Sequence, residues 1–257
     1  MKLAPDWNRT AADYARHRAG FPDWFFERMA ERGLFRPSSR ILDIGTGTGT
    51  LARGLALRGA AVTGLDLAPG MMEAAKSLDK SAGVTIPYLV APAEATGLPD
   101  ASFDLISAGT CWHWFDRAKV MAEVMRLLKP GGYLVIANLI WLPLPGNVVA
   151  QTEALILAHN PAWHLGGWEG HYADQQRDLI DGGFTARESA AVDYDIPYSP
   201  EAWRGRIRGS AGIAASLGAA EVEKFDGELA AMLARNFPGD PVPVPHRLVV
   251  IWGRKPS

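Results

Sequence analysis

Short apolar runs alternate with segments of helical period along the first part of the chain. The apolar runs predict β-strands at residues 40–45, 60–67, 84–92, 103–109 and 131–139. The segments between them predict helices at residues 51–59, 69–78 and 116–128. This alternation is typical of a parallel sheet that carries helices on both faces. We therefore expect an α/β fold with a doubly wound, mostly parallel sheet.

The helix expected at residues 116–128 shows the pattern most clearly. Its apolar positions recur at helical spacing and are Val120, Met121, Val124, Met125, Leu127 and Leu128. Asp116 is suited to cap the first turn, and the following "KPGG" is a stop signal. One face of this helix should therefore pack on the sheet.

The alternation becomes irregular after Leu142. A helix is expected at residues 148–159 and strands at 184–197 and 246–254, with an aromatic, glycine-rich segment at 160–172. These late segments are short and interleaved with strands, so we interpret them as insertions. The expected organisation is a single domain, 1–257, with an N-terminal helical lid (1–36), a core (37–140), lid insertions among the late strands (141–245) and the last strand (246–254).

The composition is that of an ordinary globular protein, with 48% hydrophobic and 21% charged residues among 257. A formal net charge of −2 argues against a nucleic-acid partner and against a strongly membrane-attracted surface. The longest apolar run, residues 133–142, is about half as long as a bilayer span. Because the chain has one cysteine and no apolar signal region near residue 1, we expect a cytoplasmic protein.

A glycine-rich loop, "DIGTGTG" at residues 43–49, follows the first expected strand and opens the first expected helix. Open α/β sheets bind nucleotides at this place. A dinucleotide fingerprint would have a third glycine at position 50, where this chain has Thr50. S-adenosylmethionine fits better, because it has no pyrophosphate to seat and because Asp43 would attract its ammonium group.

Asp66 stands at the end of the second expected strand. A carboxylate there can accept hydrogen bonds from both hydroxyls of a ribose, whether the ligand is a dinucleotide or S-adenosylmethionine. The alternative is a tight strand-to-helix turn that binds no ligand. Three glycines together with two acids at strand ends favour a cofactor site.

Three stretches of the sequence resemble the successive motifs of class I S-adenosylmethionine-dependent methyltransferases. They are "ILDIGTGTGTLARGLALRGAAVTGLDLAPGMMEAA", "APAEATGLPDASFDLISAG" and "MRLLKPGGYLVI". The further stretch "WHWFD" resembles the small-molecule branch that includes trans-aconitate methyltransferase-like proteins. The resemblance implies a seven-stranded, Rossmann-like sheet whose last strand is antiparallel. It also implies S-adenosylmethionine as cofactor and S-adenosylhomocysteine as product.

The resemblance further implies individual contacts to the cofactor. Gly45 and Gly47 would approach its methionyl part, Asp66 would hold the ribose, and Leu67 and Met71 would sandwich the adenine. The complete set of cofactor-binding candidates is Tyr14, Arg18, Asp43, Gly45, Thr46, Gly47, Asp66, Leu67, Met71, Ala93, Glu94 and Gly109.

Two departures from the family pattern affect the adenine contacts. Pro92 stands where relatives have an aspartate, so Ala93 and Glu94 would serve the adenine amine, and Ala68 replaces a serine helix cap. In relatives the N-terminal helix acts as a lid, and Tyr14 and Arg18 would reach the methionine carboxylate. A solvated basic helix face is the alternative for Arg18.

The segment "TCWHWFD", residues 110–116, contains the only cysteine. Cys111 and His113 would point the same way in an extended segment, but nothing completes a triad, so a thiol nucleophile is not favoured. Six histidines without a helical i, i+4 pair and without a second cysteine predict no metal site. We interpret the segment as a pocket wall. His113 is the candidate catalytic residue, either as a cofactor contact or as a general base, and a structural histidine is the alternative.

The acceptor pocket should come from the insertions. Its candidate residues are Trp114, Trp163, His164, Trp168, His171, Tyr172, Arg204 and Arg208. The aromatic members suit a small aromatic acceptor, or they pack inside the lid. The two arginines, four residues apart, could grip a carboxylate, or they are solvated surface charges.

The function expected from these features is methyl transfer from S-adenosylmethionine to a small molecule, a carboxylate or an aromatic acceptor, by in-line displacement. Two alternatives stay open. One is a protein that binds the cofactor without catalysis. The other is a nicotinamide-dependent oxidoreductase, which Thr50 and the absence of a Tyr-x-x-x-Lys pair disfavour.

Overall fold

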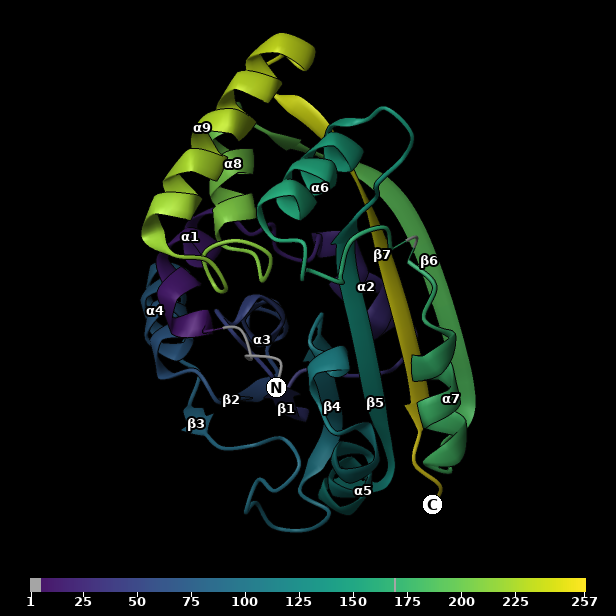
Figure 1. Ribbon diagram of the computed structural model, residues 1–257. Helices are drawn as coiled ribbons and strands as arrows, with labels where there is room; N and C mark the ends of the chain where they lie inside the picture. Colours follow the sequence, from purple (N-terminus) through teal and green to yellow (C-terminus); the bar gives the residue numbers. More distant parts are fainter. Residues whose placement is uncertain (1–5, 169) are drawn as a thin grey trace. The chain divides into compact units, whose positions relative to one another are not determined.

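The fold is built on one seven-stranded sheet. The computed structural model describes residues 6–168 and 170–257. The strands follow the order β3-β2-β1-β4-β5-β7-β6, with helices on both faces of the sheet (Figure 1). This confirms the expected doubly wound, Rossmann-like α/β fold.

Five strands form the parallel part of the sheet. They are β1 (Arg40–Ile44), β2 (Ala61–Asp66), β3 (Tyr88–Val90), β4 (Phe103–Gly109) and β5 (Leu128–Trp141). β1 pairs with β2 and with β4, and Asp43 lies opposite Gly64 on one side and opposite Ser107 on the other. The carboxyl ends of β1 and β2 therefore lie side by side, where parallel sheets bind ligands.

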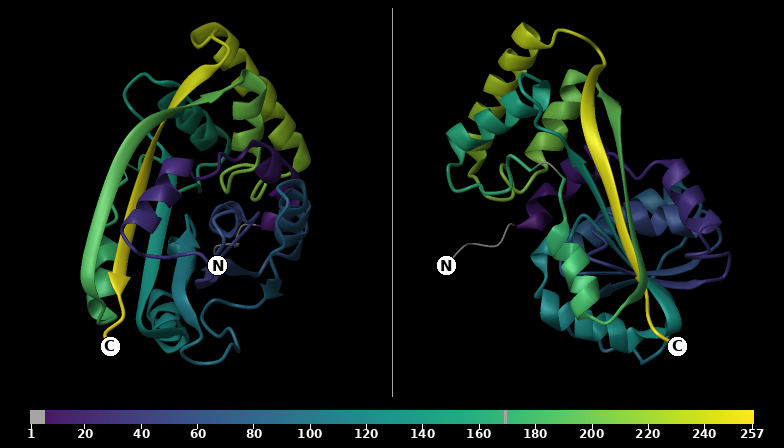
Figure 2. Two further views of the ribbon diagram at one scale, coloured as in Figure 1. Left: turned by 180° about the vertical axis from the view of Figure 1, so that it is seen from behind. Right: turned by 90° about the vertical axis from the view of Figure 1, so that its right-hand side faces the viewer.

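The remaining strands, β6 (Thr185–Tyr198) and β7 (Val242–Arg254), are long neighbours, seen from two sides in Figure 2. Backbone bonds join Gly131 N–H to the Lys255 carbonyl and Leu142 N–H to the Pro245 carbonyl. The start of β5 thus meets the end of β7, and the end of β5 meets its start, so β7 is antiparallel to β5. This agrees with the expected antiparallel last strand.

Two strand boundaries differ from the expectation. β7 begins four residues before position 246, inside the proline-rich segment, because a proline that cannot donate still offers its carbonyl to the ladder. β5 begins at Leu128, directly before the "KPGG" that we interpreted as a helix stop, and it includes these four residues. Turn-forming residues can therefore end a helix and start a strand with no loop between them.

The chain divides into two compact units. The first unit, called the insertion unit below, comprises residues 1–19, 140–171 and 193–247; the second, called the core unit, comprises residues 20–139, 172–192 and 248–257. β5, β6 and β7 each supply residues to both units. The expected single domain, with its boundaries at residues 36, 140 and 245, stays a prediction.

The core unit contains most of the sheet and its helices. The helices are α2 (Asp23–Glu31), α3 (Thr50–Ala56), α4 (Pro69–Ser81), the 3₁₀ turn η2 (Trp112–Trp114), α5 (Arg117–Leu127) and α7 (Ala173–Asp181). The Asp116 side chain accepts a hydrogen bond from Lys119 N at 3.3 Å, as expected for the cap of α5. Val120, Val124 and Leu127 of α5 are buried, so the helix packs through the expected apolar face.

The insertion unit has its own helices and core. The helices are η1 (Trp7–Thr10), α1 (Ala11–His17), α6 (Val148–His159), α8 (Pro200–Arg208) and α9 (Ala219–Asn236). Large apolar side chains from α6, α8, α9 and the strand ends form its core, among them Ile156, Trp203, Phe225 and Val244. None of the described helices is long and apolar enough to cross a membrane.

Candidate cofactor and acceptor sites

The glycine loop lies between β1 and α3 in the core unit. Gly45, Gly47 and Gly49 have φ values of 61°, 54° and 73°, in the left-handed region that favours glycine. A Cβ at Gly45 would lie 2.8 Å from Cys111 Sγ, whereas one at Gly47 would meet only Met71 Cε at 3.7 Å. The loop therefore needs glycine for its turns, and at Gly45 also for close packing.

Asp66 ties this loop to the next helix. Its Oδ2 accepts a hydrogen bond from Gly47 N at 2.8 Å, and its Oδ1 accepts one from Ala68 N at 2.9 Å. The second bond serves the start of α4, where Ala68 has no side-chain oxygen to offer. Each oxygen keeps a lone pair for a further donor, so the carboxylate can still hold two ribose hydroxyls.

Asp43 lies beneath the loop and is 1% exposed. Its Oδ2 accepts a hydrogen bond from Thr46 Oγ1 at 2.7 Å, and its Oδ1 accepts one from Ser107 Oγ at 2.7 Å. Burial raises the pKa of Asp43 to about 6, although both hydroxyls oppose the shift. The carboxyl is mostly ionised at neutral pH and provides negative charge at the end of β1.

The other expected cofactor residues of the core unit lie at the same strand ends or just beyond them. Leu67 is 66% exposed directly after Asp66, which is unusual for leucine and suits a contact with a flat ligand. Met71 is buried beside Gly47. Ala93 is buried, and Glu94 Oε1 accepts a hydrogen bond from Asp116 N at 2.9 Å, so Glu94 also supports the start of α5. Gly109 ends β4.

Cys111 is a packing residue of the core unit. Its Sγ lies 3.2 Å from the carbonyl oxygen of Ile44, and burial raises the pKa of the thiol well above its usual value. A thiolate is therefore disfavoured, in agreement with the interpretation that Cys111 is no nucleophile. Among the residues that the structure describes, no group of three or more metal-binding side chains occurs.

The segment around His113 is a 3₁₀ turn, not the extended segment that we expected. Trp112 is completely buried, and its Nε1 donates a hydrogen bond to Asp178 of α7 at 2.8 Å. Trp112 is thus a structural anchor. His113 is half-buried, with its ring 4.7 Å from that of Trp114, which is 39% exposed. Only His113 and Trp114 remain available as pocket wall.

The aromatic candidates of residues 160–172 do not form one cluster. Trp163 is buried in the core of the insertion unit against Gly212, which supports the alternative of lid packing. His164 and His171 are exposed, and Trp168 Nε1 donates to the His171 carbonyl at 3.1 Å. Tyr172 is buried at the start of α7, in the core unit.

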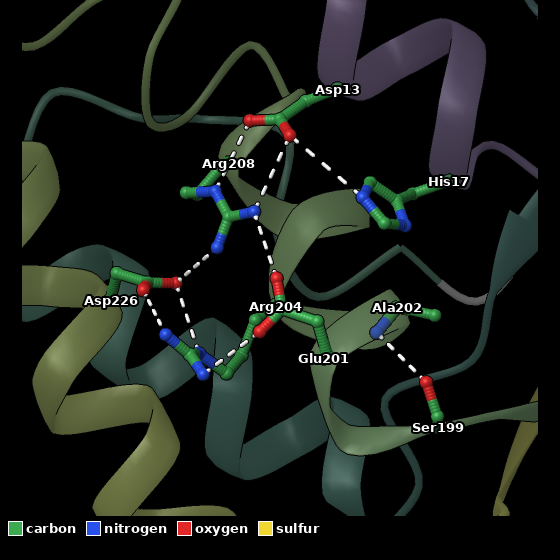
Figure 3. A network of polar contacts seen from close by, with 8 residues as sticks. All are labelled: Asp13, His17, Ser199, Glu201, Ala202, Arg204, Arg208 and Asp226. Atoms are coloured by element: carbon green, nitrogen blue, oxygen red, sulfur yellow. Dashed lines mark hydrogen bonds and ion pairs between the residues drawn. The ribbon is translucent and has the colours of Figure 1, made fainter.

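Arg204 and Arg208 already have carboxylate partners within the insertion unit, as Figure 3 shows. Both guanidinium groups pair with Asp226 of α9 and with Glu201. Arg208 Nε also donates to Asp13 of α1 at 3.1 Å. These ion pairs join α1, α8 and α9, and they argue against the expected grip on a ligand carboxylate.

Arg206, which the sequence interpretation missed, lies on the other side of α8. It is 7% exposed, and its guanidinium lies 4.7 Å from the centre of the Trp141 ring. Burial, and after it the positive charge of Arg18, lowers the pKa of Arg206 to about 10. The helical spacing of Trp203, Arg206 and Ile207, all buried, is the signal that would have identified it.

Tyr14 and Arg18 come from α1 and its C-terminus, and the Arg18 guanidinium lies 5.3 Å from the Tyr14 ring. Both residues influence the charge of Arg206. The structure therefore brings these two expected cofactor residues into the electrostatic surroundings of Arg206, within the insertion unit.

Comparison with known proteins supports the interpretation of the core. Residues 42–136 match the family model described as a methyltransferase domain. Malonyl-acyl-carrier protein O-methyltransferase of Serratia marcescens is 35% identical over 114 residues, which cover 44% of this chain and 43% of that protein. The chain spans about half the length of the curated relatives that it matches.

Solved structures of similar fold cover nearly the whole chain. Phosphoethanolamine N-methyltransferase 2 of Haemonchus contortus, solved with S-adenosylhomocysteine, has a TM-score of 0.58 at 18% identity and covers 97% of this chain and 58% of its own. The 4+2 cyclase SpnF has a TM-score of 0.56 at 18% identity, with 99% and 98% covered. These likenesses show the fold. The family match covers residues 42–136, and this part of the chain is therefore similar to a methyltransferase domain.

Proposed function

We propose that this protein transfers the methyl group of S-adenosylmethionine to a small organic acceptor. The observation that carries the proposal is the pair of carboxylates, Asp43 and Asp66, at adjacent strand ends around a loop with three left-handed glycines. Asp66 can hold the ribose, and Asp43 supplies the negative charge that an ammonium group requires. The family match over the same residues supports this cofactor.

When bound, the cofactor supplies a methyl group that its sulfonium makes electrophilic. The chain's own residues then have to align the acceptor and exclude water, and alignment can lower such barriers by about 7–11 kcal/mol. His113 and Trp114 are the candidate residues at the end of β4 for that task. A base is needed only if the acceptor must lose a proton, and His113 is the residue we assign to that role.

Calorimetric titration with S-adenosylhomocysteine tests the cofactor. We expect wild type to bind it and Asp66→Ala to bind about 10- to 100-fold more weakly, because hydrogen bonds to a charged group are lost. Asp100→Ala is the matched control, since Asp100 is an exposed aspartate paired with Arg126. Circular dichroism should show that both variants are folded.

Turnover completes the test. Release of S-adenosylhomocysteine from S-adenosylmethionine, followed by mass spectrometry across a panel of carboxylic acids and phenols, should identify accepting compounds. Failure of wild type to bind S-adenosylhomocysteine would refute the proposal, and binding of NADH instead would favour the oxidoreductase alternative. Binding without turnover on any acceptor would favour a cofactor-binding protein without catalysis.

A further inference from the structure

Arg206 is a buried cation without a carboxylate partner. Among the described residues, no aspartate or glutamate forms an ion pair with Arg206, which is 7% exposed. Its neighbours on the same helix are different, because Arg204 and Arg208 share Asp226 and Glu201. A buried charge of this kind is costly unless an anion compensates it.

Tyr198 supplies a second polar group beside Arg206. The hydroxyl of Tyr198, at the end of β6, is buried and has no hydrogen-bond partner among the described residues. Tyr198 and Arg206 border the same pair of rings: the Arg206 guanidinium lies 4.7 Å from the Trp141 ring, Trp141 contacts Trp203, and the Tyr198 ring lies 5.4 Å from that of Trp203. Tyr198 also raises the pKa of Arg206, as expected for a neighbouring hydroxyl. A phenol donor and a guanidinium fork side by side, neither with a carboxylate partner among the described residues, match the two oxygens of one carboxylate.

Aromatic rings surround this pair within the insertion unit. Trp141 lies under the guanidinium, and its Nε1 donates to Glu153 at 2.7 Å, which fixes the ring. The second oxygen of Glu153 accepts a hydrogen bond from Gly167 N at 2.7 Å, which holds the carboxyl group in place. Glu153 therefore positions the Trp141 ring. On the other side, the His246 ring is stacked 6.0 Å from that of Tyr198.

His246 adds no opposing charge. Its Nδ1 lies 2.8 Å from the Val244 carbonyl, which therefore accepts the proton of the neutral ring, and burial lowers the pKa of His246 to about 4. Arg18 contributes a second positive charge. Glu153 is the acidic group among these residues, and both of its oxygens already accept hydrogen bonds from Trp141 and Gly167. The other groups are cationic or aromatic, which suits an organic anion with a flat or apolar body.

We propose that Arg206 and Tyr198 bind a carboxylate of the methyl acceptor. This inference rests on the proposed function, because the bound acid is a methyl acceptor only if the protein transfers methyl groups. It names organic acids as the substrate class. The acceptor is preferred over the amino-acid end of the cofactor as the source of the carboxylate. The amino-acid end of the cofactor carries an ammonium group beside its carboxylate, which Arg206 and Arg18 would repel, whereas an acid acceptor need carry no such charge and its apolar body suits the ring of Trp141.

The test compares acids with their amides. Benzoate and succinate are titrated calorimetrically into the full-length protein, with benzamide and succinamide as neutral isosteres, in the presence and absence of S-adenosylhomocysteine. We expect at least one acid to bind wild type and its amide to bind about 10- to 100-fold more weakly. Equal affinity for acid and amide, or no binding of either acid, would overturn the proposal.

Four variants locate the site. Arg206→Met and Tyr198→Phe should weaken acid binding about 10-fold or more, and Arg206→Lys should lose less than Arg206→Met because it keeps the charge. Tyr198→Phe removes a hydroxyl that has no partner, so it should fold normally even if Arg206→Met does not. Arg204→Met, which removes an ion-paired arginine from the same helix, should leave acid binding unchanged. Loss in Arg204→Met alone would contradict the assignment.

The cofactor arm separates the two sources of a carboxylate. S-adenosylhomocysteine carries an amino-acid carboxylate, and 5′-methylthioadenosine lacks it. If Arg206→Met weakens binding of the first ligand and spares the second, Arg206 holds the cofactor and the acceptor assignment is wrong. Failure of the proposed function looks different, because wild type would then bind neither nucleoside. If wild type binds neither nucleoside but still binds acids in a way that depends on Arg206, the carboxylate site is confirmed and its role in methyl transfer is refuted.

Discussion

Asp43 combines complete burial with a carboxyl group that is mostly ionised at neutral pH. Because its pKa is raised to about 6 in the folded protein, above its value in an unfolded chain, the unfolded state releases its proton first as pH rises. The stability that the raised pKa gives is present at low pH and is lost as pH rises through about 6. The carboxyl therefore weakens the fold at neutral pH.

We predict that Asp43→Asn removes this pH-dependent loss of stability, because asparagine does not ionise. From about pH 4 to pH 7, the free energy of unfolding of wild type should fall relative to the variant by roughly 2 kcal/mol. Urea denaturation of both proteins at several pH values measures this difference, in which the titration of all other groups cancels. A difference that stays constant with pH would show that the pKa of Asp43 is not raised.

The sequence predicted the position of a residue in the fold well where the hydrophobic pattern fixes its strand. Asp43 and Asp66 could be assigned because each ends a strand of clear periodicity. Arg206 could not, because its role depends on Tyr198 and Trp141, which come from distant strands. In the sequence, Arg204 and Arg208 are as suitable as Arg206 for binding a ligand carboxylate. Only the structure shows that Asp226 forms ion pairs with both of them.

At the scale of elements, the turn from β1 to α3 depends on what surrounds each glycine. We predict that Gly45→Ala destabilises the protein more than Gly47→Ala, by about 1–3 kcal/mol. Both variants place alanine at a left-handed φ, which costs roughly 1–2 kcal/mol. Only at Gly45 would the new Cβ also collide with the Cys111 side chain.

Urea denaturation of the two alanine variants measures this difference, and Gly97→Ala, a left-handed glycine with nothing within 4 Å, controls for the backbone alone. We expect Gly47→Ala and Gly97→Ala to lose similar stability. Equal losses in all three variants would mean that Cys111 can move aside.

Element types were predicted better than element ends. The strands and helices of residues 40–139 follow a simple period, because one face of each is buried against the sheet. The start of β7 and the 3₁₀ turn η2 escaped prediction for a physical reason. Prolines and a short polar-aromatic run have no period of their own, and pairing with neighbouring strands and the Trp112–Asp178 bond decide their structure.

At the scale of the whole molecule, three strands contribute to both compact units. We predict that thermal unfolding is a single transition, because neither unit can melt without breaking strands that the other shares. Differential scanning calorimetry should give a calorimetric enthalpy equal to the van't Hoff enthalpy. Two resolved transitions would show that the units are independent and would contradict the expectation of one domain.

The position of β7 has a consequence for how the protein is made. β7 follows every other strand of the sheet in the sequence, and it lies between β5 and β6, which the ribosome completes earlier. Until its residues emerge, β5 and β6 each present an open edge that can pair with another chain. The sheet can close only after β7 has been synthesised, so nascent chains that stall before β7 should be the species that most need a chaperone.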